Sequence, residues 1–151
     1  MRYLLVDRIL EWTAGERIQG VKNVAMSEDF LEFHFPWRPI MPGALLLEAL
    51  GQLAGWLEAA SSDFQRWFLL QRVQKCMFYG FALPGDTVEL DVKSRAGPDG
   101  ARRVFIGACN VQGAKRVVAE FEGETIPLAD LEDRERQRRL FQYLTRDRMS
   151  A

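Results

Sequence analysis

One apolar, helix-forming run, residues 44–60, constrains the fold of this chain more than any other feature. Leu, Ala, Glu and Gln dominate the run and β-branched residues are scarce, which predicts a helix. Its large apolar side chains fall on nearly every helical face: Leu45, Leu46, Leu47, Leu50, Leu53, Trp56 and Leu57. A helix that is apolar all round is buried all round. We therefore expect a β-sheet wrapped around one central helix.

Bulk composition excludes several classes of protein. The chain has 151 residues, which favours one domain with a sizeable core. Its net charge of −1 offers no basic field for binding nucleic acid. The apolar run is interrupted by Glu48, Gln52 and Glu58 and is shorter than the ~20 residues of a membrane span. Two isolated cysteines, Cys76 and Cys109, fit a reducing compartment, so we expect a cytoplasmic protein without a membrane span.

Before the central helix, the pattern predicts short elements. Residues 1–10 indicate a short helix or turn, residues 18–26 have a partial strand pattern, and the aromatic stretch 30–35 indicates an extended segment. Pro42 stands where the helix would begin, a position that tolerates a missing backbone N–H.

After the helix, turn residues separate five predicted strands. The breaks contain Pro-Gly-Asp, Gly-Pro-Asp-Gly and Gln-Gly, and such short connections favour antiparallel pairing. The predicted strands are residues 68–73, 76–81, 87–94, 104–111 and 115–124. The fold class is therefore α+β. The charged tail, residues 130–148, predicts a solvated helix that packs weakly through an edge formed by Leu140, Phe141 and Leu144 and frays at its end.

The only histidine, His34, precedes a glutamate, Glu48, by 14 residues. Neutral imidazole suits proton abstraction near neutral pH. Glu48 is flanked by leucines, and burial would raise the pKa of such a carboxyl and keep it protonated as an acid. One histidine and two distant cysteines make a zinc site improbable, and Cys76 reads as a small core residue rather than a nucleophile. The chain has neither a P-loop nor a glycine-rich dinucleotide signature.

The histidine and the glutamate belong to one longer motif, His34-Phe35-Pro36-x-x-Pro39-x-Met41-Pro42-Gly43-x-Leu45-x-x-Glu48-Ala49-x-x-Gln52-x-x-Gly55. This motif resembles the signature of the FabZ type of 3-hydroxyacyl-[acyl-carrier-protein] dehydratases. Weaker matches agree in register at residues 4–8, 22–24, 78–86 and 117–120. The resemblance covers roughly residues 2–126.

This resemblance implies the hotdog fold, an antiparallel sheet around a central buried helix, over residues 1–127, with 128–151 as a charged helical extension. It implies removal of water from a (3R)-3-hydroxyacyl thioester to give the trans-2-enoyl thioester, in fatty-acid or specialised lipid biosynthesis. The substrate would be carried on the phosphopantetheine arm of acyl carrier protein, with no further cofactor and no metal. The resemblance also implies a homodimer, extended to a hexamer in many members, in which each site takes its histidine from one protomer and its glutamate from the other.

The resemblance also implies roles for individual residues. His34 would be the base at C2, and Glu48 would assist departure of the C3 hydroxyl. The backbone N–H of Gly43 would polarise the thioester carbonyl. Gln52, four residues after Glu48 on the same helical face, would orient Glu48 or the leaving water, although a buried amide that only packs is an equal reading. The acyl chain would contact aromatic side chains, with four candidates: Phe33, Phe35, Trp37 and Trp56.

Two departures from the family pattern bear on substrate size. Phe33 replaces the common glycine before the histidine, and Trp37 and Arg38 stand where small or polar residues are usual. Two alternative functions are an acyl thioesterase that uses Glu48 to activate water, and a non-catalytic acyl-binding subunit with an active partner. Candidate docking cations for acyl carrier protein are Arg38, Arg66, Arg72 and Lys75, although ordinary surface charge is the favoured reading of any one of them.

Overall fold

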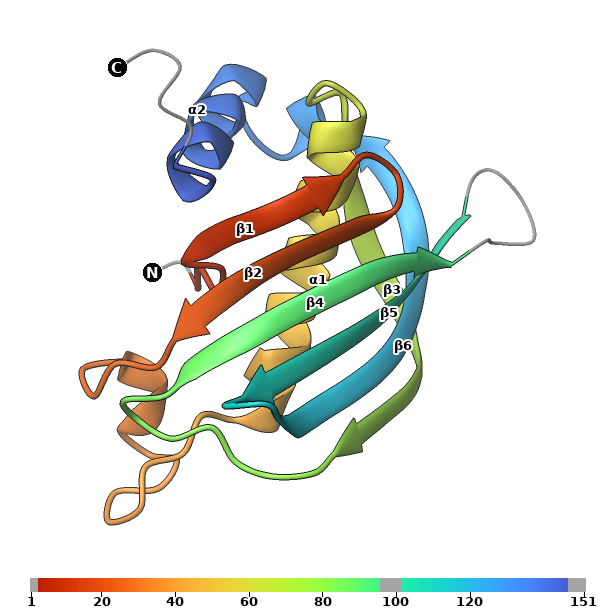
Figure 1. The fold of residues 1–151 in the computed structure, drawn as a ribbon. Coiled ribbons are helices and arrows are strands. Elements are labelled where there is room, and N and C mark those ends of the chain that lie inside the picture. Colours follow the sequence, from red (N-terminus) through yellow and green to blue (C-terminus); the bar gives the residue numbers. More distant parts are fainter. Residues whose placement is uncertain (1–2, 96–101, 147–151) are drawn as a thin grey trace.

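A six-stranded antiparallel sheet curls around one long helix (Figure 1). The structure, a computed structural model, describes residues 3–95 and 102–146. The strand order is β1-β2-β4-β5-β6-β3, so β1 and β3 are the two edges. The strands are β1 (Arg8–Thr13), β2 (Arg17–Asn23), β3 (Arg66–Phe78), β4 (Thr87–Arg95), β5 (Arg102–Val111) and β6 (Ala114–Pro127).

The central helix, α1 (Gly43–Ser61), confirms the predicted helix within a residue at each end. Pro42 is the cap residue just before it rather than its first residue. Leu46, Leu50 and Leu53 are fully buried against the concave face of the sheet. The prediction that α1 is buried on every side is wrong for its first half, where Ala44 and Glu48 are exposed. The second half, from Leu53 to Ala59, is buried.

Two predictions before α1 are wrong. Residues 1–10 are expected to form a short helix or turn, but Arg8–Thr13 form the edge strand β1, because a turn at Gly15 (φ +71°) folds them back onto β2. The aromatic stretch 30–35 is not extended. It contains the 3-10 turn η1 (Asp29–Leu31), and its backbone bonds locally, with the His34 N–H donating to the Leu31 carbonyl. The alternating aromatic residues mimic a strand, yet the only buried residue of the stretch 30–35 is Leu31.

The strands after α1 confirm the predicted antiparallel series, except that two of the predicted strands are one continuous strand. The predicted strands 68–73 and 76–81 are one strand, β3, which pairs with β6 along its length and has two register shifts between Leu70 and Lys75. These irregularities break the alternation of apolar residues, which explains the false gap. Strands β4, β5 and β6 lie where the sequence predicts them.

The C-terminal helix packs more firmly than predicted. A second 3-10 turn, η2 (Leu128–Asp130), leads into α2 (Arg134–Leu144), where Phe141 and Leu144 are buried in the core. Phe141 contacts Trp12, Trp56 and Phe64 with ring centroids 5.5–5.9 Å apart. The predicted frayed end lies largely outside the described residues. Figure 1 shows α2 beside β1, whereas the loop before α1 lies at the opposite end of the molecule.

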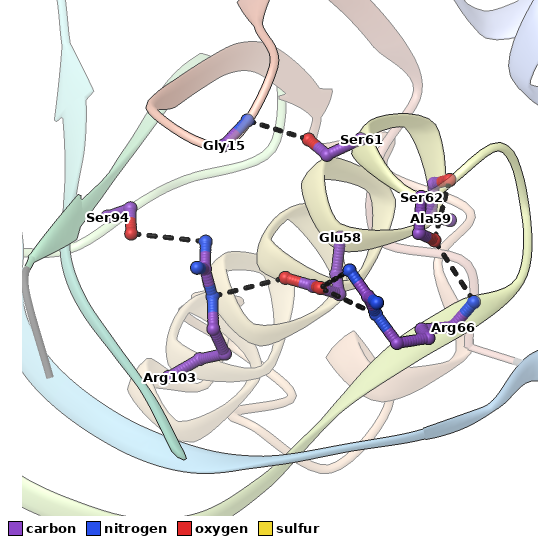
Figure 2. Close-up of polar contacts among 8 residues, drawn as sticks. All are labelled: Gly15, Glu58, Ala59, Ser61, Ser62, Arg66, Ser94 and Arg103. Atoms are coloured by element: carbon purple, nitrogen blue, oxygen red, sulfur yellow. Dashed lines mark hydrogen bonds and ion pairs between the residues drawn. The ribbon is translucent and has the colours of Figure 1, made fainter. Parts of the chain in front are cut away.

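A buried carboxylate fixes the last turns of α1 to the sheet (Figure 2). Glu58 is 3% exposed and accepts a hydrogen bond of 3.2 Å from Arg66 Nε. Its second oxygen lies 3.2 Å from Arg103 Nε, an ion pair whose geometry is not that of a hydrogen bond. Arg103 also donates to the Ser94 hydroxyl, and the Ser61 hydroxyl accepts from the Gly15 N–H. These contacts join α1 to β3, β5 and the β1–β2 turn.

Candidate active site

His34 lies in the loop between η1 and α1, not in a strand. Its Nδ1 is 3.0 Å from the backbone carbonyl oxygen of Ile40. A carbonyl oxygen only accepts hydrogen bonds, so Nδ1 carries the hydrogen in neutral His34 and Nε2 is left as the proton acceptor. The Ile40 N–H donates to the His34 carbonyl at 2.8 Å, which closes the loop on itself. The imidazole is therefore held in the tautomer that a general base requires.

His34 and Gly43 line the same cavity, of about 520 Å³, at the start of α1. Its other lining is mostly apolar. Half of it comes from the end of β3 and the loop after it, including Phe78 and Phe81, and half from residues 40–46. A side chain at residue 43 would not fit, because a Cβ there would lie 2.6 Å from Phe78 Cε1. The first N–H groups of α1 lack carbonyl partners within the helix and carry partial positive charge. The cavity thus brings a base close to a site that favours a developing oxyanion.

Glu48 is exposed on the single chain, contrary to the expectation that its leucine neighbours bury it. Those leucines turn to other faces of α1, since residues i and i±1 do not share a face. Gln52 confirms the expected spacing: its Nε2 donates to Glu48 Oε1 at 3.2 Å. The same amide donates to the Tyr3 carbonyl and accepts from the Leu5 N–H, both at 2.9 Å. Gln52 is therefore hydrogen-bonded to Glu48 and also holds the N-terminal segment against α1.

The single chain does not bring His34 and Glu48 into one cavity. Glu48 is not among the residues that line the His34 cavity. Gln52, one helical turn beyond Glu48, lines a different cavity near α2. The two candidate catalytic residues thus face different surroundings within this chain.

The four aromatic residues predicted to contact substrate lie in three different environments. Phe35 lines a cavity of about 570 Å³ next to that of His34, together with Arg38. Phe33 and Trp37 are 80% and 95% exposed and line neither of these two cavities. Trp56 is 6% exposed and packs edge-on against Trp67, with centroids 5.2 Å apart. Of the four, Phe35 stacks on the His34 ring, with ring centroids 4.5 Å apart.

The cysteines are poor nucleophiles in this fold. Burial raises the pKa of Cys109 to about 12, and its Sγ lies 3.7 Å from the Leu46 carbonyl oxygen. Burial also raises the pKa of Cys76, which is half-buried on β3. Among residues 3–95 and 102–146, no three His, Cys, Asp or Glu side chains are grouped so that they could hold a metal ion. Nor does any helix within those ranges combine the length and apolarity needed to cross a membrane.

The candidate docking cations are dispersed. Arg38 borders the Phe35 cavity, whereas Arg66 is engaged by Glu58 at the far end of α1. Arg72 and Lys75 are exposed on the edge strand β3. Sequence reasoning missed Arg116, whose Nε donates to the Phe81 carbonyl at 2.6 Å beside the His34 cavity. No local motif marks Arg116, because the pairing of β3 with β6 brings it there.

Comparisons with known proteins agree on one family. A family model described as the FabA-like domain matches residues 1–122. The chain is 45% identical over 91 residues to a 3-hydroxyacyl-[acyl-carrier-protein] dehydratase FabZ of Nitratidesulfovibrio vulgaris, a match that covers 58% of this chain and 59% of that protein. It is 38% identical over 116 residues to the FabZ protein of Shewanella sediminis, a match that covers 74% of each.

The fold agrees with a solved structure at much lower identity. The hot-dog-like protein from Thermanaerovibrio acidaminovorans superposes with a TM-score of 0.63 at 20% identity, over 84% of this chain and 93% of that one. This likeness and the sheet around α1 confirm the predicted hotdog fold. The family model ends at residue 122, so η2 and α2 lie beyond it.

Proposed function

This chain belongs to the FabA-like domain family, and we propose that it dehydrates (3R)-3-hydroxyacyl-[acyl-carrier-protein] to the trans-2-enoyl thioester in fatty-acid or specialised lipid synthesis. The observation that supports this most strongly is His34, held as the Nδ1–H tautomer in a largely apolar cavity that also contains Gly43. The dehydratases among its relatives support the same reaction.

The chemistry divides between three groups. Nε2 of His34 takes the proton from C2, and the electrons of that C–H bond form the C2–C3 double bond. The C3–O bond breaks, and Glu48 supplies the proton with which the hydroxyl leaves as water. Negative charge that develops on the thioester oxygen is stabilised by the Gly43 N–H, and one such donor contributes about 3 kcal/mol to lowering the barrier.

The active site requires two copies of the chain in this proposal. Glu48 is exposed and does not line the His34 cavity, so a second copy would both bury Glu48 and bring a histidine to it. The edge strand β3 offers a surface for this contact, because Val73, Met77 and Phe78 are at least 39% exposed along it. A homodimer is the minimal assembly, and a hexamer built from three such dimers is compatible with it.

Acyl carrier protein is the proposed partner, with the substrate on its phosphopantetheine arm. Arg38 and Arg116 lie near the His34 cavity and would face the acidic carrier. The chemistry assigned to His34 and Glu48 uses only protein groups and requires neither a cofactor nor a metal ion. A cytoplasmic location is consistent with the two free thiols.

The decisive assay follows enoyl absorbance and free thiol together, with 3-hydroxyacyl-carrier protein as substrate. Loss of the base in His34→Ala should lower kcat by about 10²–10⁴-fold. Lys93→Ala, an exposed position on β4, should retain wild-type activity as the matched control. Turnover that persists in His34→Ala would exclude the proposed base.

The same assay separates two other functions. Release of free thiol without an enoyl product would indicate an acyl thioesterase with Glu48 as the base. Retained binding of the acyl carrier without either reaction would indicate a non-catalytic subunit, for which the exposed Phe33 and Trp37 would be the contact surface.

A further inference from the structure

A cavity of about 350 Å³ lies between α1, the N-terminal segment and α2. Gln52 and Trp56 of α1 line it, as do Trp67 of β3 and Leu4 near the N-terminus. Glu48, Gln52 and Trp56 follow one another at four-residue intervals, so they lie along one face of the helix. Because Gln52 donates to Glu48, this cavity begins one helical turn from the proposed acid.

The outer wall of this cavity comes from residues beyond the family match. Leu128, Leu131 and Leu140, together with Gln137, follow residue 122 and all line it. This wall is held in place on its other side, where Phe141 and Leu144 are buried in the core. Arg134 Nε also donates to the Phe64 carbonyl at 2.8 Å, which fixes the start of α2. The wall is therefore a packed element and not a loose tail.

The lining suits an apolar occupant and disfavours an anion. Two indole rings and four leucines form most of it, with Gln52, Gln137 and Glu132 as its polar side chains besides Tyr3. No lysine or arginine is among these lining residues, so a carboxylate or phosphate would find no counter-charge there. A hydrocarbon chain that starts at the reacting carbons beside Glu48 and runs along the face of α1 would enter this cavity with its far end.

We infer that the η2–α2 wall sets the acyl chain length of this enzyme, because the cavity it closes takes the distal end of the acyl chain. The inference rests on the proposed dehydratase function. In this inference, Leu131 and Leu140 determine which acyl chain lengths the enzyme accepts, and they take no part in the chemistry. Short acyl chains end before the cavity and do not reach the wall.

The test compares kcat/KM for hydration of trans-2-butenoyl and trans-2-hexadecenoyl carrier-protein thioesters. Leu131→Trp fills the cavity from a side chain that is 50% exposed, so the fold tolerates it. It should lower kcat/KM for the long thioester by about tenfold or more and leave the short one unchanged. Leu140→Ala enlarges the cavity and should shift the ratio in the opposite direction. Gln142→Trp, an exposed position on α2 that does not line the cavity, should match wild type.

Each outcome bears on one of the two proposals. A folded Leu131→Trp protein whose long-to-short ratio equals that of wild type would overturn the chain-length assignment and leave the dehydratase function standing. An equal loss on both thioesters would overturn it too. If the wild-type protein turns over neither thioester, the proposed dehydratase function is contradicted, and the chain-length assignment that rests on it is contradicted too.

Discussion

At the scale of single residues, the chemistry of His34 depends on one backbone carbonyl. The Ile40 oxygen fixes the Nδ1–H tautomer at 3.0 Å, and the loop that supplies it closes before α1 begins. A histidine without such a partner would divide between two tautomers, and only one presents Nε2 as a base. The sequence predicts the residue and its role, but the tautomer comes from the folded loop.

Cys109 should make stability depend on pH in the alkaline range. Burial raises its pKa to about 12 in the folded chain, against 9.0 when exposed. Above pH 9.0 the unfolded state loses this proton while the folded state keeps it, so the free energy of unfolding falls as pH rises toward 12. The slope from this group approaches about 1.4 kcal/mol per pH unit.

Urea unfolding of wild type and Cys109→Ala at several pH values between 8 and 11 measures this effect, since other groups titrate equally in both proteins. The difference in unfolding free energy between the two proteins should shrink by about 1 kcal/mol per pH unit above the thiol pKa. A difference that stays constant across this range would show that the Cys109 thiol ionises alike in both states.

At the scale of elements, two glycines of α1 should respond oppositely to the same substitution. A Cβ at Gly55 would overlap the Trp67 ring, whereas the nearest atom to a Cβ at Gly51 is Leu70 Cδ1, at 3.4 Å. Gly55→Ala should therefore destabilise the fold by about 1–3 kcal/mol through overpacking. Gly51→Ala should stabilise it by up to about 1 kcal/mol through helix propensity. Thermal unfolding of both variants checks this. A stabilised Gly55→Ala protein would contradict the prediction, because it would show that the Trp67 ring moves aside without loss of stability.

Most helices and strands, but few of their tertiary contacts, could be predicted from the pattern of residues. The long helix is predicted by its composition, and the strands after it are predicted by the turn residues, such as Pro-Gly, that separate them. Residues 30–35 could not be predicted, because their aromatic alternation imitates a strand while their backbone bonds within the loop. The apolar edge of α2 could be predicted, but not that Phe141 and Leu144 of this charged segment are buried in the core. Their partners Trp12, Trp56 and Phe64 are distant in sequence.

At the scale of the whole molecule, the proposed site depends on an assembly that the sequence pattern does not describe. The motif from His34 to Glu48 predicts one site, yet the single chain places only His34 and Gly43 in a common cavity. No pattern within one chain reveals where a second copy lies. The open first half of α1 and the exposed edge of β3 are the features that a second copy would cover.

A complementation assay tests this shared site most directly. His34→Ala and Glu48→Gln chains, carrying different tags, are co-expressed, and mixed dimers are purified through both tags; each parent homodimer serves as a control and should be inactive. In a mixed dimer with shared sites, one site has both wild-type residues and the other has neither, so about half of the wild-type activity per dimer should return. Mixed dimers as inactive as both parents would contradict a site built from His34 of one protomer and Glu48 of its partner.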